Sequence, residues 1–347
     1  MPKSSARVAI VLVNWNGWVD SVECIDSVLA CGYPDLHIYL VDNDSSDQSV
    51  EHIIAWCEKP LRSPGSRDFT GVGRYSDAGV PVRYRLLEDP KDVLPVAPAD
   101  CRLTIIRSGG NLGFAGGNNV GIRVAGLAHY DYFWLLNTDT VIHADALGRL
   151  VERARQDPSI GIVGSTLLYY AQPTLVQAMG GATLDTARMV MKHIGVNLPL
   201  GDVPQNPMEI EANMAYVVGA SMLVSRQFIE EVGYMQEDYF LYFEEIDWAV
   251  RSKGKYRMGY APRSLVYHKE GASSAKTVSW FSMRLLYRNR LKFVGRFFPD
   301  RVSATVRHLV WEMCWLLLTG RFIYAKAIAS ALRDRHQLVA SGSVHPL

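Results

Sequence analysis

The chain has 347 residues, 48% of them hydrophobic, so it can bury a large core in one large domain or two smaller ones. A formal net charge of +1 gives no support for a nucleic-acid partner. The five cysteines lack paired spacing, which argues against a disulfide framework and suits a reducing compartment. No window offers about 20 uninterrupted apolar residues, so we expect no transmembrane helix. The first residues lack the apolar region of a signal peptide, so we expect a cytoplasmic protein.

The start of the chain alternates between continuous apolar runs and helical spacing. A strand, a helix, a second strand and a second helix are predicted, in that order, over residues 8–13, 19–30, 36–41 and 47–58. Ser46 or Asp47 could cap the second helix. This order predicts an α/β fold with a doubly wound, mostly parallel sheet.

Residues 59–100 interrupt this alternation, because they are rich in Pro, Gly, Arg and Asp. A loop of this length is typical of a lid or a mobile insertion. The elements predicted beyond it are a strand at 103–106, a glycine-rich loop at 108–117, a helix to 128, a strand ending at Asp139, strands at 160–169 and 216–224, a helix at 245–253 and short strands up to His268. From Trp280 onward the pattern is helical and basic, which predicts a separate appendage.

The apolar run from Tyr132 to Asn137 is followed by an acid, Asp139. In open α/β sheets, ligands bind beyond the carboxyl ends of the strands, which is where this acid would lie. A carboxylate there could hold Mg²⁺ or Mn²⁺ against a diphosphate. The alternative is an ordinary strand-end turn, since Asn-Thr-Asp is common turn chemistry.

Two further segments follow predicted strands. Asp42, the first residue after the second strand, could accept hydrogen bonds from a ribose or a base edge, whereas Asp47 is more simply a helix cap. The glycines of 111–119 let the backbone approach a ligand, and the start of a helix favours anionic groups. A dinucleotide-binding fingerprint would have to follow the first strand, and the sequence there, 14–17, lacks it.

Three acids, Glu244, Glu245 and Asp247, follow the aromatic run 239–243. Partial desolvation beside these rings would raise a carboxyl pKa toward that of a general base. Glu245 and Asp247 cannot share one helix face, so one would face the site while the other caps or orients. The alternative is an ordinary helix start with favourable acids. A lone histidine such as His268 is usually structural, but it could be a second ligand to a metal at Asp139.

Taken in order along residues 6–275, apart from the insertion, these segments resemble the inverting family 2 nucleotide-sugar glycosyltransferases, in particular their bacterial rhamnosyltransferase-like branch. The segments that carry the resemblance are Val13 to Asn16, Val41 to Asp47, Asn111 to Asn119, Leu136 to Asp139, Gly219 to Ser221, Phe240 to Trp248, and Tyr267 with His268.

The resemblance implies a GT-A fold over residues 1–275, a nucleoside-diphosphate sugar donor, and Mg²⁺ or Mn²⁺ as the cofactor. It makes Asp139 the metal-binding acid, His268 the metal histidine, and Glu245 the catalytic base, with Glu244 as the alternative. The residues that we expect around the cofactor and the donor are Val13, Asn14, Asn16, Asp42, Asn43, Asp44, Asn111, Gly113, Gly116, Asn118, Asp139 and Arg288. The glycine-rich loop at 113–117 is expected to shape the pocket for the sugar and the acceptor.

The implied reaction is a direct displacement that inverts the anomeric carbon. The base takes the proton of an acceptor hydroxyl, and the metal neutralises the departing diphosphate. The expected sugar is rhamnose, and the expected acceptor is a cell-surface glycan or a lipid-linked saccharide. One alternative is a binding regulator without catalysis, since Asn137 replaces the first acid of the family's Asp-x-Asp element. A nucleotidyltransferase would need a basic loop after the first strand, which is missing.

Residues 276–347 bear on the acceptor. Four basic residues recur at intervals of four with only Asp300 nearby, namely Arg284, Arg288, Lys292 and Arg296. The segment 309–318 is apolar on nearly all sides but too short to span a bilayer. Both features suit a peripheral contact with the cytoplasmic face of an anionic membrane. The alternatives are a helical hairpin packed on the catalytic domain or against a second subunit in a homodimer, and Arg288 could instead grip the donor diphosphate.

Overall fold

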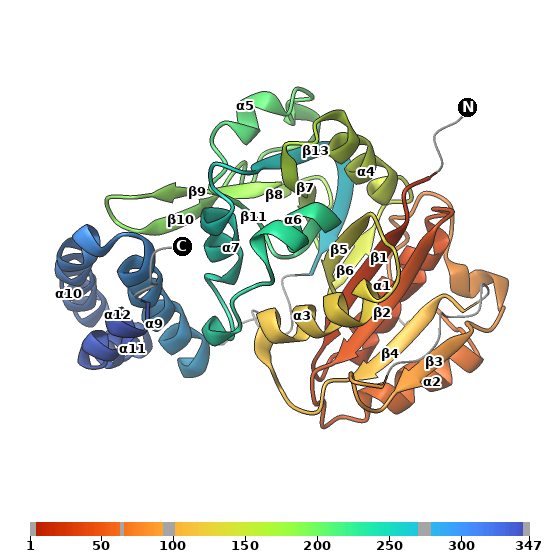
Figure 1. The fold of residues 1–347 in the computed structure, drawn as a ribbon, viewed down its shortest axis with the longest axis horizontal. Coiled ribbons are helices and arrows are strands. Elements are labelled where there is room, and N and C mark those ends of the chain that lie inside the picture. The colour runs from red at the N-terminus through yellow and green to blue at the C-terminus, as the bar shows by residue number, and fades with distance from the viewer. Residues whose placement is uncertain (1–4, 63–65, 93–100, 270–278, 343–347) are drawn as a thin grey trace.

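The computed structural model describes residues 5–62, 66–92, 101–269 and 279–342. A ten-stranded sheet runs through the molecule in the order β3-β4-β2-β1-β5-β12-β7-β13-β6, with β8 paired to β7, and β10-β9-β11 form a second sheet (Figure 1). The predicted boundary at 275–276 and residues 93–100 of the predicted insertion lie outside the described residues.

The strands are β1 (Val8–Asn14), β2 (Leu36–Asp42), β3 (Tyr84–Leu87), β4 (Leu103–Arg107), β5 (Tyr132–Asn137), β6 (Thr140–Ile142), β7 (Ile160–Tyr169), β8 (Val176–Met179), β9 (Gly181–Asp185), β10 (Val190–His193), β11 (Tyr216–Val217), β12 (Ser221–Ser225) and β13 (Arg257–His268). The α-helices are α1 (Trp18–Ala30), α2 (Ser49–Glu58), α3 (Gly113–Gly126), α4 (Ala146–Gln156), α5 (Met208–Glu211), α6 (Arg226–Val232), α7 (Glu244–Arg251), α9 (Trp280–Phe297), α10 (Val302–Leu318), α11 (Phe322–Arg333) and α12 (Arg335–Gly342).

The predicted doubly wound, mostly parallel sheet is confirmed. Strands β3, β4, β2, β1 and β5 are parallel, and β12 enters antiparallel between β5 and β7. Successive side chains of β1 point to opposite faces, so Ile10 belongs to the core that includes α1, α2 and α4, while Val11 belongs to the core that includes α3, α6 and α7. Burial on both faces explains why these strands read as continuous apolar runs.

Residues 66–87 of the predicted insertion pack against the rest of the molecule. Its strand β3 extends the sheet beside β4. The buried guanidinium of Arg74 pairs with Glu23 of α1 at 3.1 Å, and Phe69 stacks on Tyr267 with ring centroids 4.1 Å apart. Since these contacts reach across the molecule, composition alone gave no sign of them.

Several boundaries also differ from the prediction. The glycine-rich loop at 108–117 is partly helical, because α3 already starts at Gly113. Gln48 occupies the N-cap position of α2 with φ 59°, while Asp47 accepts from the backbone N–H of Ser49 at 3.1 Å. The predicted short strands before His268 form the single 12-residue strand β13. The elements that the sequence pattern did not predict are β3, β6, β8, β9, β10, α4, α5 and α6.

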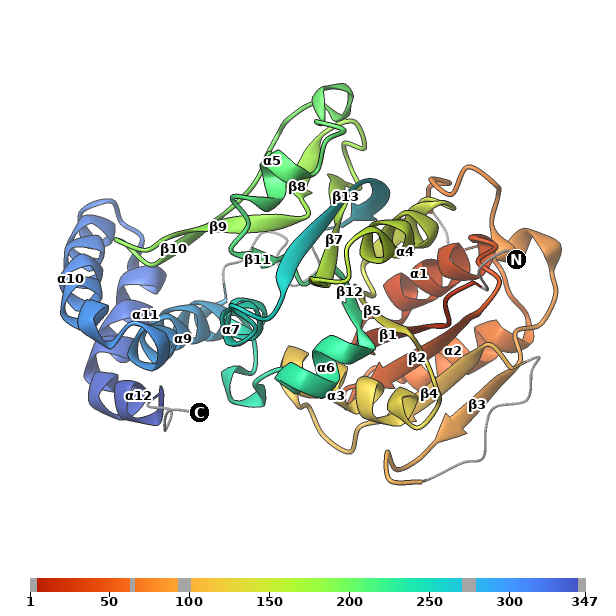
Figure 2. The same ribbon diagram turned by 45° about the horizontal axis from the view of Figure 1, so that its top comes forward.

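Helices α10–α12 stand at the end of the molecule opposite β3 and α2 (Figures 1 and 2). They pack with α9 around their own core, which includes Leu291, Leu309 and Ile328. Helix α9 itself is not a separate appendage, because Phe293 belongs to the core that also contains α7. Within the described ranges, no helix combines the length and the apolar character that crossing a bilayer requires.

The predicted basic stripe is not a free surface. Lys292 pairs with Asp238 at 2.5 Å and Arg296 pairs with Asp247 at 3.0 Å, so both cations are used inside the protein. The side chains of Lys292 and Arg296 are only 10% and 15% exposed. The expectation that this stripe meets a membrane is therefore wrong for these two residues.

Candidate active site

An acid and a histidine meet at the carboxyl edge of the sheet. Strands β6 and β13 pair antiparallel with Thr140 opposite His268, which brings Asp139, in the turn before β6, next to the histidine ring. Asp139 Oδ1 lies 3.2 Å from His268 Nε2, and both side chains are mostly buried. Gln177 Oε1 of β8 lies 2.8 Å from His268 Nδ1.

This pair has the chemistry of a divalent metal site. Burial alone would raise the pKa of Asp139, but the hydrogen bond and the charge of His268 outweigh it, so the pKa is lowered. An amide oxygen only accepts, so the Gln177 contact places a proton on Nδ1 and directs Nε2 toward Asp139. A cation could replace the proton between Nε2 and the carboxylate. Among the described residues, no cluster of three or more His, Cys, Asp or Glu side chains could hold a metal ion by itself.

The first turn of α7 presents a second acidic group. The carboxylate of Glu245 accepts a hydrogen bond from the backbone N–H of Gly219, and burial raises its pKa. A side chain at Gly219 would displace this carboxylate from its present position. The next residue, Ala220, accepts from the backbone N–H of Asn137 at 3.1 Å. Glu245 is thereby linked through one short backbone segment to the turn that carries Asp139.

The neighbours of Glu245 have other roles. Glu244 is buried, and its Oε2 has no hydrogen-bond partner among the described residues. Burial and the charge of Glu245 hold the pKa of Glu244 well above its usual range. Asp247 accepts from Tyr239 Oη at 3.0 Å and pairs with Arg251 and Arg296. Its carboxylate is occupied, so we assign Asp247 to orienting the helix rather than to the chemistry.

The loop before α7 has an unusual backbone that helix α9 supports. Phe240, Tyr242 and Phe243 have φ of 66°, 69° and 79°, in the left-handed region that residues with side chains rarely adopt. The buried Asn289 of α9 donates to the carbonyls of Tyr239, Leu241 and Tyr242 at 2.8, 2.8 and 3.1 Å. Sequence reasoning missed Asn289. Its signal is an asparagine in a helix interior, where the residue is unfavourable without such partners.

The predicted nucleoside residues Val13, Asn14, Asn16, Asp42, Asn43 and Asp44 come together at the ends of β1 and β2. Asn14 and Asp42 are paired in register, and Asn14 Nδ2 donates to Asp42 Oδ1 at 2.9 Å. Asn16 accepts from the backbone N–H of Ser46 at 2.7 Å, which ties the two loops together. Both Asn16 and Asp44 have positive φ and are exposed. A ligand can therefore reach Asp44 more easily than the buried Asp42.

The start of α3 is occupied by protein contacts. Asn43 accepts from the backbone N–H of Leu112 at 3.0 Å, and the N–H of Phe114 donates to the carbonyl of Phe240 at 2.7 Å. Gly113 has φ 71° and lies against that same carbonyl. Asn111 lies exposed just before this turn. Of these two N–H groups, that of Phe114 supports the loop before α7 and that of Leu112 is held by Asn43.

Two other predicted ligands on this helix are also used internally. Asn118 is buried and donates to the carbonyl of Phe114 at 2.9 Å, and Gly116 lies against Leu112. Arg288 on α9 is different, because its buried Nε has no partner within the described part of the chain.

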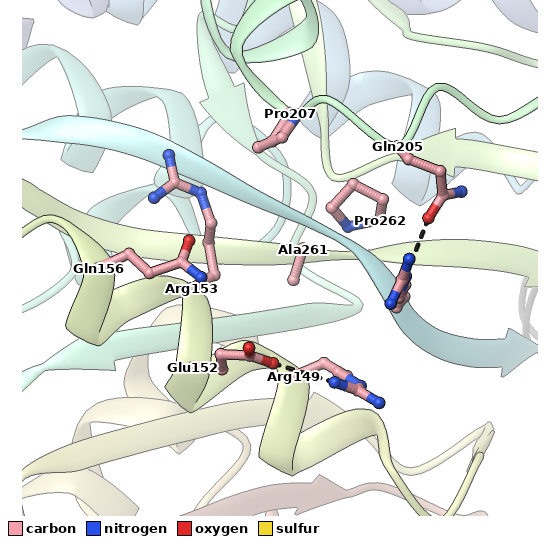
Figure 3. A pocket seen from close by; sticks show the side chains of 9 residues that line it. Arg149, Glu152, Arg153, Gln156, Gln205, Pro207, Ala261 and Pro262 are labelled. Atoms are coloured by element: carbon pink, nitrogen blue, oxygen red, sulfur yellow. Dashed lines mark hydrogen bonds and ion pairs between the residues drawn. The ribbon is translucent and has the colours of Figure 1, made fainter.

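A pocket of about 190 Å³ between α4 and β13 is lined by Arg149, Arg153 and Arg263 among others (Figure 3). None of its lining residues is a predicted site residue.

Part of the chain is similar in sequence to known glycosyltransferases. Residues 90–233 match the family model Glycosyl transferase family 2. Over 237 residues the chain is 25% identical to the low-salt glycan biosynthesis hexosyltransferase Agl10 of Haloferax volcanii, covering 65% of this chain and 74% of that protein.

Two solved structures share the fold. GalNAc-T7 with UDP, GalNAc and Mn²⁺ matches with a TM-score of 0.56 at 13% identity, covering 85% of this chain and 49% of that chain, so this chain spans about half of its length. The mannosyltransferase PcManGT from Pyrobaculum calidifontis, in complex with GDP-Man and Mn²⁺, matches with a TM-score of 0.52 at 13% identity, covering 96% and 88%. At this identity the likeness shows the fold alone. The family match and the shared fold together support a glycosyltransferase of the GT-A type.

Proposed function

We propose that the protein is an inverting glycosyltransferase that moves a hexose-type sugar from a nucleoside-diphosphate sugar to a hydroxyl group of a glycan or lipid-linked acceptor. The observation that carries this proposal is the Asp139–His268 pair at the carboxyl edge of the sheet, linked to Glu245 through Gly219 and Ala220. Support also comes from the hexosyltransferase name of the Haloferax relative and from the nucleotide sugar bound by the mannosyltransferase. For the sugar we propose rhamnose, on the sequence resemblance alone.

Asp139 and His268 would hold a divalent cation, Mg²⁺ or Mn²⁺. When bound, the cation supplies positive charge against the diphosphate that leaves. The lowered pKa of Asp139 keeps this ligand anionic over the working pH range, and Gln177 fixes the orientation of the histidine ring. The Mn²⁺ in both solved neighbours is consistent with this assignment.

Glu245 would be the general base. Its carboxylate takes the proton of the acceptor hydroxyl as the hydroxyl oxygen bonds to the anomeric carbon. The bond from that carbon to the phosphate oxygen breaks on the opposite face, and the nucleoside diphosphate leaves with the electron pair. Because the pKa of Glu245 is raised toward neutral pH, its carboxylate is a stronger proton acceptor than an ordinary carboxylate. Asp44, Asp42 and Arg288 are proposed to contact the nucleoside and the diphosphate.

The test is a screen of nucleotide sugars, starting with dTDP-rhamnose and including UDP- and GDP-hexoses. We expect hydrolysis or transfer of one donor with Mg²⁺ or Mn²⁺ and none in excess chelator. Saturable donor binding without turnover of any donor would favour the alternative of a catalytically inactive regulator, for which Asn137 is the motivating residue.

A further inference from the structure

The outward face of α10 is apolar and uncovered. Within α10 its residues repeat at helical spacing, and exposed apolar residues continue into the start of α11. Trp311, Trp315 and Leu318 are 64%, 44% and 87% exposed. We call this set the α10 face, and its members are Val310, Trp311, Cys314, Trp315, Leu317, Leu318, Phe322 and Ile323. Such a cluster of exposed aromatic and aliphatic side chains is typical of an interaction site.

Most of the exposed charges around the α10 face are positive. The exposed cations between residues 301 and 339 are Arg301, Arg307, Arg321, Lys326, Arg333 and Arg335. The same segment contains two acids, Glu312 and Asp334, both partly buried, and Glu312 is paired with Arg290 at 3.3 Å. The guanidinium of Arg321 lies 5.5 Å from the ring of Trp315, so cation and apolar surface are presented together.

A groove beside the α10 face has the same character. It lies between α10 and α12, has a volume of about 530 Å³, and has an apolar floor of Val302, Val306 and Val339. Arg307 lines this groove and also lies at one end of the α10 face, and Arg335 lines it as well. Apolar surface bordered by cations therefore extends over both features.

We propose that the α10 face docks on the surface of an anionic lipid bilayer. Trp side chains favour the boundary between headgroups and acyl chains, and the long Arg and Lys side chains can reach lipid phosphates from there. No described helix could cross a bilayer, so the helix would lie along the membrane surface. A second copy of the chain fits less well, because a two-fold contact over this face would bring the cations of one copy, including Arg307 and Arg321, close to the same set of cations on the other.

This surface differs from the Arg284–Arg296 stripe, two of whose cations are used in ion pairs inside the protein. Docking by the α10 face would occur whether or not the protein transfers a sugar. If the proposed function holds, a lipid-linked acceptor would be met at the same membrane.

The experiment is vesicle co-sedimentation of the full chain, using phosphatidylcholine alone and phosphatidylcholine mixed with phosphatidylglycerol, at low and high salt. We expect binding to the anionic vesicles that weakens with salt. The double variant Trp311→Ala, Leu318→Ser should bind at least about tenfold more weakly, because burying two large apolar side chains contributes more than one decade of partitioning. Leu127→Ser is the matched control, since Leu127 is 66% exposed at the C-terminal end of α3 and lies outside the α10 face. It should bind like wild type.

Cys314 gives an independent readout, because it is exposed within the α10 face while Cys24, Cys57 and Cys101 are buried. A polarity-sensitive fluorophore on Cys314, in a Cys31→Ser background, should shift to shorter wavelength with anionic vesicles. Donor hydrolysis measured without vesicles should be the same for the double variant and wild type, so a failure of docking is distinguished from a failure of the proposed function. Equal vesicle binding by the double variant would overturn the proposal. Self-association lost in that variant, without vesicle binding by wild type, would overturn it in favour of a second copy.

Discussion

The candidate active site contains two acidic regions whose carboxyl pKa values are shifted in opposite directions. Asp139 lies beside the His268 ring, and its pKa is lowered although it is mostly buried. Glu244 is buried and Glu245 is half-buried, no ion pair to either is found among the described residues, and the pKa of each is raised. Burial alone therefore does not set the direction of the pKa shift, because a charged neighbour such as His268 can reverse it. The first region is suited to holding a cation and the second to accepting a proton.

The largest expected effect is at Asp139. Asp139→Ala should reduce metal-dependent turnover by roughly 10³-fold or more, since losing the charge that neutralises a leaving group costs several kcal/mol. The measurement is turnover with and without Mn²⁺, with circular dichroism to confirm folding. Asp145→Ala is the matched control, because the Asp145 side chain is 64% exposed at the start of α4. Full wild-type activity in excess chelator would contradict the metal assignment.

The second region is tested by isosteric amides. Glu245→Gln should lower turnover by roughly 10²–10⁴-fold with little change in donor affinity, the size expected for removing a general base. Glu244→Gln should retain most of the activity, because burial already favours the uncharged form at that position. If Glu244→Gln is inactive and Glu245→Gln is not, the base has been assigned to the wrong residue.

The side chain of Asn289 supports the loop that precedes Glu245. Asn289→Ala removes three hydrogen bonds to the loop before α7, so Glu245 should lose its position and turnover should fall by about 10²-fold. Donor affinity should be unchanged, and the acidic limb of the pH–rate profile should move as the surroundings of Glu245 change. Asn213→Ala is the control, because Asn213 is exposed and lies between α5 and β11. An unchanged pH profile together with unchanged turnover would show that Asn289 does not position the base.

The smallest expected effect is on the free energy of unfolding. Its dependence on pH has opposite signs for Glu244 and Asp139. The raised pKa of Glu244 means that its stabilising contribution is present below its unfolded value near 4.5 and is lost as pH rises through the folded value. Glu244→Gln should therefore be more stable than wild type at neutral pH but not in acid. The contribution of Asp139, whose pKa is lowered, is present above about 3.8 and is lost as pH falls. Urea unfolding over a pH series measures both, and a Glu244→Gln gain that does not vary with pH would contradict the assigned charge state.

The elements that the sequence predicted well are those with strong local patterns. The strands β1, β2, β4 and β7 are continuous apolar runs, so their existence followed from the residues themselves. The pairing of β6 with β13, which brings His268 to Asp139, joins distant segments, and only the family resemblance indicated it. The contacts of Asn289 and Arg74 depend on the packing of distant elements, and their residue types gave no local pattern.

The backbone of the loop before α7 has a consequence for adaptation to heat. Three left-handed residues with side chains, Phe240, Tyr242 and Phe243, each cost roughly 1–3 kcal/mol. Glycine at Tyr242 would remove most of the cost at that one position but would also loosen the segment that carries Glu245. Selection for a higher melting temperature should therefore find easy gains at these positions, and selection for turnover should reverse them. This short loop is where the two demands on the chain would oppose each other most directly.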